Sequence, residues 1–226
     1  MKENIAITVS DAIAENDHDI LIYKSKLSQE KVKWIDDYLK DFLEPGKTII
    51  ELGCGSGKQL FKMEEYGLKT IGLEISREMI KRIEVNKNEI KSKIEIIEGS
   101  YYNIPLGNAS VDYVLFPLNI IENSYDEYET ICKEVKRILK RNGQYFITMK
   151  ENIGKVIEKH NKYTNEYNIL EGSYASKINT PSKENIKYPT YHWSVAFEQY
   201  IAQKHLRFEK IIEINDGVFL LIYSKK

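Results

Sequence analysis

The sequence predicts an α/β fold, in which short buried strands alternate with amphipathic helices. A short apolar run at residues 48–52 ends in three closely spaced glycines and is followed by residues with helical spacing. The same order of an apolar run and an amphipathic segment recurs along the chain. Two final apolar runs, joined by Asn215-Asp216-Gly217, predict a terminal β-hairpin.

Composition narrows the class of protein. A chain of 226 residues suffices for one α/β domain but not for two of ordinary size, so we expect a single domain over 1–226. With Lys+Arg 33 against Asp+Glu 34, the balance is near neutral and does not favour a nucleic-acid partner. No apolar run of about twenty residues and no leader pattern is visible, so we expect a cytoplasmic protein without a membrane partner. The two cysteines, Cys54 and Cys132, form neither a disulfide framework nor a metal site, so no metal is expected.

The N-terminal part, residues 1–45, is expected to be a helical extension. Residues 1–27 show no clear period, whereas apolar residues recur at helical spacing from Ser28. The recurring apolar residues are Val32, Ile35, Leu39 and Phe42. Pro45-Gly46 closes this segment, which is expected to pack against the sheet.

The turn after the first strand is the first candidate site. Glu51 precedes Leu52, and Gly53, Gly55 and Gly57 follow before a helix opens at Lys58. Glycine has no Cβ, so it permits positive φ and lets the backbone approach a ligand closely. A strand, a glycine turn and a helix N-terminus in this order are typical of α/β cofactor sites. The alternative is an ordinary tight turn.

A second candidate is Glu74, at the end of a strand predicted at Lys69–Ile75. Ser76 is expected to cap a helix that extends to about Lys87. A carboxylate at this position can accept both hydroxyls of a ribose, because it accepts two donors at once. The alternative is a solvated residue at a strand end, and we expect the side chain to be partly exposed.

The stretch from Glu51 to Gly57, an acidic residue followed by Leu-Gly-x-Gly-x-Gly, resembles the first motif of class I S-adenosylmethionine-dependent methyltransferases. Nicotinamide-binding domains also carry a glycine-rich turn, but the spacing of Gly55 and Gly57 favours the methyltransferase pattern. Ile104-Pro105-Leu106 and the segment 109–114 continue the resemblance, which extends from about Trp34 to Lys226.

The resemblance implies a Rossmann-like, seven-stranded, mostly parallel sheet with an antiparallel last strand and helices on both faces. It also implies S-adenosylmethionine as cofactor and methyl transfer to a small-molecule acceptor, with release of S-adenosylhomocysteine. The alternatives are a non-catalytic S-adenosylmethionine-binding regulatory module and a nicotinamide-dependent reductase. A monomer or a homodimer is expected.

The same resemblance implies the cofactor contacts. Glu51 would help to orient the amino group of the cofactor, Glu74 would bind its ribose, and Ile75 would pack on its adenine. Where the family has Gly-Asp after the third strand, this chain has Gly99-Ser100-Tyr101. The implied cofactor-binding residues are Glu51, Gly53, Cys54, Gly55, Gly57, Glu74, Ile75, Ser100, Tyr101, Phe116, Pro117 and Tyr23.

Residues 150–190 interrupt the alternation of strands and helices. The segment is polar, rich in tyrosine and longer than ordinary connections, so we expect either a lid over the acceptor pocket or a surface insertion. At its far end, Tyr191 and His192 resemble the entry to the last helix in a branch of small-molecule methyltransferases. They are the candidate catalytic residues. The alternative for His192 is a structural or surface role.

Overall fold

The computed structural model describes residues 7, 11, 26–117, 127–150, 167–169, 175–181, 187–193, 195–215 and 217–226. Its helices are α2 (Lys26–Trp34), α3 (Lys58–Glu65), α4 (Arg77–Ile90), α5 (Tyr128–Ile138) and α7 (Val195–Ala202). The strands of its larger sheet are β1 (Thr48–Leu52), β2 (Lys69–Glu74), β3 (Glu95–Glu98), β4 (Val111–Phe116), β5 (Leu139–Lys150), β9 (Leu206–Asn215) and β10 (Val218–Lys225).

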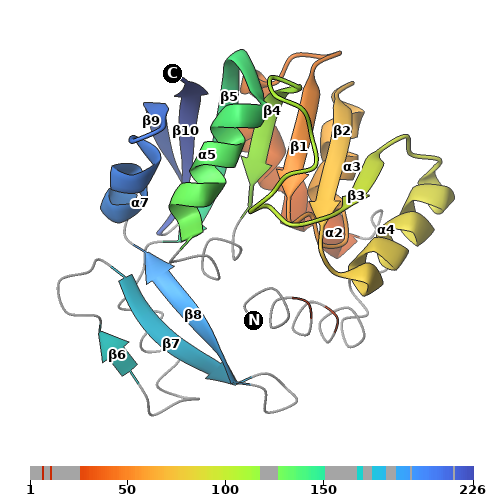
Figure 1. The fold of residues 1–226 in the computed structure, drawn as a ribbon. Helices are drawn as coiled ribbons and strands as arrows, with labels where there is room; N and C mark the ends of the chain where they lie inside the picture. Colours follow the sequence, from red (N-terminus) through yellow and green to blue (C-terminus); the bar gives the residue numbers. More distant parts are fainter. Residues whose placement is uncertain are drawn as a thin grey trace.

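The larger sheet has seven strands in the order β3-β2-β1-β4-β5-β10-β9 (Figure 1). β1 pairs in parallel with both β2 and β4, and the strands on either side, β3 and β5, are also parallel to their neighbours. β10 pairs antiparallel with both β5 and β9. The prediction of a mostly parallel, seven-stranded sheet with an antiparallel last strand is confirmed.

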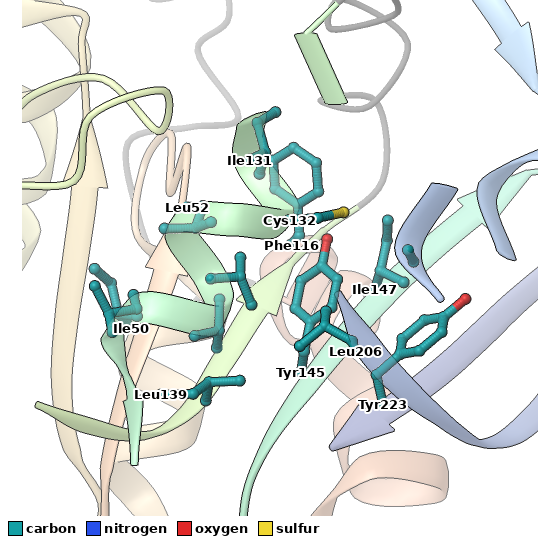
Figure 2. Packing of buried hydrophobic residues seen from close by; sticks show 14 of the residues in the cluster. Ile50, Leu52, Phe116, Ile131, Cys132, Leu139, Tyr145, Ile147, Leu206 and Tyr223 are labelled. Atoms are coloured by element: carbon teal, nitrogen blue, oxygen red, sulfur yellow. The ribbon is translucent and has the colours of Figure 1, made fainter. Parts of the chain in front are cut away.

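Helices cover both faces of this sheet, as predicted. Side chains alternate between the two faces along each strand, so neighbouring residues enter different clusters. Ile50 and Leu52 of β1 lie in a cluster with Ile131 of α5, part of which is shown in Figure 2. Ile49 lies in a second cluster, which includes Phe61 of α3 and residues of α2. The two clusters hold the sheet between two helical layers.

The predicted N-terminal helix forms, but it is not a regular α-helix along its whole length. α2 is followed by a π-helical stretch, Ile35–Leu39, and by a short 3₁₀ turn, Lys40–Phe42. Ile35 and Leu39 are both fully buried, so the wider turn keeps the apolar face of the segment against the sheet.

The segment 150–190 contains regular structure that its polar composition does not predict. β6 (Tyr167–Ile169), β7 (Ala175–Pro181) and β8 (Lys187–Trp193) form a separate antiparallel sheet in that order. In Figure 1 this smaller sheet lies beyond the edge of the larger sheet at which the parallel strands end. Across the described ranges, no helix is long and apolar enough to cross a membrane.

Candidate functional site

The glycine-rich turn is held against the end of β2. The backbone N–H groups of Gly53 and Cys54 both donate to the carbonyl oxygen of Leu73, at 2.8 and 3.1 Å. Gly53, Gly55 and Gly57 have φ of 69°, 53° and 80°, a region that disfavours any residue with a Cβ. A Cβ added at Gly55 would meet no described atom within 4 Å, so the turn opens into space at this residue.

A fourth glycine, Gly72, supports the turn and was not identified from the sequence. A Cβ at Gly72 would lie 2.5 Å from Cδ1 of Leu60 and 2.6 Å from Sγ of Cys54. Both distances are below contact, so only glycine lets the turn and α3 lie this close to β2. The available signal was a glycine inside an otherwise apolar strand.

Glu51, near the end of β1, is buried and has no hydrogen-bond partner among the residues that the structure describes. Its side chain is 1 % exposed, and in the described part of the chain neither carboxylate oxygen has a hydrogen-bond partner. Burial raises the pKa of Glu51 well above its usual range, and the nearby carboxylate of Glu74 raises it further. The N–H of Leu60 lowers this pKa in part but does not reach hydrogen-bond geometry. A buried acceptor of this kind is costly unless a ligand supplies a donor.

Glu74, at the end of β2, is also buried, which corrects the expectation of a partly exposed side chain. It is only 5 % exposed. Its Oε2 accepts from the N–H of Gly55 at 2.8 Å, and its Oε1 accepts from the N–H groups of Ile75 and Ser76 at 2.9 Å. Burial raises the pKa of Glu74, while these three N–H groups lower it. The carboxylate therefore ties the glycine turn to the start of α4, and about one of its four acceptor positions stays open.

The loop after β3 places aromatic rings next to the end of β4. The ring of Tyr101 packs edge-on against Tyr102 at 4.7 Å and against Phe116 at 5.7 Å between centroids. Ser100 Oγ accepts from the N–H of Tyr102 at 3.3 Å and so shapes this loop. Phe116 and Pro117 are buried, whereas Tyr101 is only half-buried. Tyr101 is thus more accessible to a ligand than Phe116 and Pro117.

Two other predicted contacts flank the turn. Cys54 is 3 % exposed, and its thiol packs inward against Gly72. Cys54 therefore contributes its backbone, and not its sulfur, to the open side of the turn. Burial raises the pKa of this thiol, which makes it unreactive. Ile75, which follows Glu74, is half-buried.

For the remaining predicted site residues, the described part of the chain shows no contact with the glycine turn. Tyr23 lies outside the described residues. Tyr191 and His192 lie on β8, where they pair with Lys177 and Ser176 of β7. Their roles stay predictions. A cluster of three or more His, Cys, Asp or Glu residues suited to a metal ion does not occur in the described ranges.

The arrangement suits a cofactor that carries an ammonium group and a ribose. An ammonium would supply the donor that Glu51 lacks, and the open acceptor position on Glu74 would take a ribose hydroxyl. The turn is open at Gly55, whose N–H donates to Glu74. S-adenosylmethionine has both groups and no phosphate. The pyrophosphate of a dinucleotide, in contrast, is an acceptor and would supply no donor to the carboxyl group of Glu51.

Comparisons with known proteins agree with this geometry. The family model for a methyltransferase domain matches residues 50–147. A demethylmenaquinone methyltransferase of Bacillus licheniformis is 29% identical over 116 residues, which are 50% of this chain and 49% of that protein. The chain therefore matches about half the length of this curated relative.

Solved structures show the same fold. The PH0226 protein from Pyrococcus horikoshii superposes with a TM-score of 0.76 at 20% identity, covering 90% of this chain and 93% of that one. A SAM-dependent methyltransferase from Aquifex aeolicus gives a TM-score of 0.64 at 18% identity, covering 89% and 96%. Residues 50–147 thus match the model of a methyltransferase domain, and the chain shares the fold of these solved structures.

Proposed function

We propose that this protein transfers a methyl group from S-adenosylmethionine to a small-molecule acceptor and releases S-adenosylhomocysteine. The observation that carries the proposal is the buried carboxyl group of Glu51, which has no hydrogen-bond partner among the described residues and lies beside the glycine turn in the stretch that matches a methyltransferase domain. Such a group is unfavourable in the free protein and becomes favourable once a cationic donor binds to it.

The residues of the turn have separate tasks in this proposal. When bound, S-adenosylmethionine supplies a methyl group on a positively charged sulfur, which is already electrophilic. The protein then has to hold donor and acceptor in line and to exclude water. Glu51 binds the amino group, Glu74 accepts a ribose hydroxyl, and the glycines let the backbone lie against the cofactor. Tyr101 covers the site from the loop after β3.

The acceptor is proposed to be small because the chain carries no excess of positive charge and because a second sheet flanks the site. β8 lies beyond the edge of the larger sheet where its parallel strands end (Figure 1). Ligands of such sheets bind at that edge. We propose that the segment 150–190 shapes the acceptor pocket, with Tyr191 and His192 as the groups that recognise the acceptor or remove its proton.

Calorimetric titration tests the cofactor. S-adenosylmethionine and S-adenosylhomocysteine should bind, and NADH should not. Binding of NADH without a response to either sulfur compound would favour the nicotinamide-dependent reductase, a function that the position of Glu51 opposes.

Turnover tests the enzyme. The full chain is incubated with methyl-labelled S-adenosylmethionine and panels of amines, phenols, thiols and carboxylic acids, with the Glu51→Gln variant as control. Label should pass to one class of acceptor only with the parent protein. Tight cofactor binding without transfer to any class would favour the non-catalytic binding module.

A further inference from the structure

A second fully buried glutamate lies outside the cofactor site. Glu198 of α7 is 0% exposed and sits between α5 and β10. The hydroxyl of Tyr128, at the start of α5, donates to its Oε1 at 2.6 Å, and the hydroxyl of Tyr223 on β10 donates to its Oε2. The hydroxyl of Tyr145 on β5 is 3.3 Å from that of Tyr128. Figure 2 shows Tyr145 and Tyr223 entering this core from neighbouring strands.

The described surroundings of Glu198 contain donors but no balancing cation. Burial raises the pKa of Glu198 to about 7, and the two tyrosine hydroxyls only partly oppose this rise. The other titratable groups packed here are Tyr145 and Cys132, and neither is positively charged. An ionised carboxylate in this position lacks the charge partner that a buried ion needs, so burial favours its neutral form.

The hydrogen bonds can be kept in both protonation states. When Glu198 is ionised, Tyr128 donates to it and can accept from Tyr145. When Oε1 takes up a proton, that O–H donates to Tyr128, and Tyr128 donates to Tyr145. The hydroxyls rotate while the heavy atoms stay in place. The cluster can therefore bind a proton and keep its hydrogen bonds. The stability of the cluster changes with the charge of Glu198.

Glu198 lies on α7, which directly follows the last strand of the smaller sheet, so its charge can affect both elements. β8 ends at Trp193 and α7 begins at Val195, so the docking of α7 fixes the end of the smaller sheet. We propose that Glu198 is a proton-linked anchor: its neutral form docks α7 firmly on α5 and β10, and loss of its proton loosens that docking and the attached end of β8. This inference does not depend on methyl transfer.

The direction of the pH dependence follows from linkage. The pKa of Glu198 in the folded protein, about 7, lies above its value of 4.5 in an unfolded chain. The folded state therefore holds the proton more strongly. The stabilisation is fully present below about pH 4.5 and is lost as the pH rises through about 7.

Thermal unfolding of the full chain tests the anchor. Glu198→Gln keeps the shape of the neutral side chain, so the parent and this variant should melt at similar temperatures at about pH 5. At about pH 8 the variant should melt higher by roughly 5–10 °C. Glu213→Gln, at an exposed glutamate of β9, is the matched control and should show no such change with pH. A difference between parent and Glu198→Gln that stays constant across this range would overturn the proposal.

Two further measurements do not require that Glu198→Gln folds. In protein labelled with ¹³C at the glutamate carboxyls, one carbon besides that of Glu51 should titrate near neutrality, and Tyr223→Phe should identify it as Glu198 by raising its midpoint, because the substitution removes a donor to the ionised form. Amide exchange of 195–202, corrected for the intrinsic rate, should be faster at about pH 8 than at about pH 5. Carboxyls that all titrate at ordinary acidic values, or exchange that is independent of pH, would contradict the anchor.

Discussion

Glu51 and Glu198 are both buried glutamates, but their surroundings are opposite. Glu51 lies at the ligand-binding edge of the sheet and has no hydrogen-bond partner in the described part of the chain, whereas Glu198 lies in the core and accepts from two tyrosine hydroxyls. Burial raises the pKa of both. Glu198 therefore contributes to the packing of the core, whereas Glu51, which has no partner among the described residues at the edge of a parallel sheet, indicates a place for a ligand.

The largest effect is expected at Glu74, which lies beside the turn as Glu51 does but accepts hydrogen bonds as Glu198 does. Glu74→Ala removes the proposed ribose acceptor and also the hydrogen bond that holds the N–H of Gly55. Binding of S-adenosylmethionine should weaken by about 1.5–3 kcal/mol, and the free energy of unfolding should fall by about 1–3 kcal/mol. Calorimetry and urea unfolding measure the two. A loss of binding without any loss of stability would show that the hydrogen bond to the N–H of Gly55 is unimportant.

Glu51→Gln should affect binding alone. The substitution removes the proposed charge-assisted contact with the cofactor, so binding should weaken by about 1.5–3 kcal/mol. The free energy of unfolding should stay level or rise, because a buried ionisable group without a partner is lost. Glu198→Gln is the matched control, and its cofactor affinity at acidic pH should equal that of the parent. A Glu51→Gln protein that is less stable but binds the cofactor normally would show that Glu51 has a structural role and not a binding role.

The smallest effect is expected at Tyr128. Tyr128→Phe removes one donor to Glu198 and leaves the ring in the core, so the free energy of unfolding should fall by about 1 kcal/mol at high pH. The loss should shrink as the pH falls, because a neutral Glu198 depends less on that donor. Urea unfolding at about pH 5 and about pH 8 measures the difference. A loss that is larger at the lower pH would show that Glu198 is held mainly in its neutral form by Tyr128.

The sequence predicted the turn and the two carboxylates beside it because both signals are local. The run from Glu51 to Gly57 spans one strand end and one turn, and Glu74 closes the next strand. The burial of Glu74 was not predictable, because it depends on how the turn after β1, which supplies the N–H of Gly55, packs against the end of β2.

The features that the sequence did not predict depend on distant contacts. Glu198 meets Tyr128 across 70 positions, and neither residue type indicates a buried pair. The strands β6–β8 arise in a polar segment without a clear alternation of apolar residues. The role of Gly72 depends on Leu60 and Cys54, which reach it only once the sheet and α3 are packed.

The central claim is that Glu51 receives the cofactor's amino group, and proton release on binding tests it most directly. In the free protein the raised pKa of Glu51 keeps its carboxyl protonated at higher pH than usual. A bound ammonium stabilises the ionised form, so binding should release a proton, and affinity should fall as the pH is lowered. Titration of S-adenosylmethionine in buffers of different ionisation enthalpy should therefore show proton release by the parent and none by Glu51→Gln. Equal proton release by both proteins, or unchanged affinity in the variant, would contradict the account.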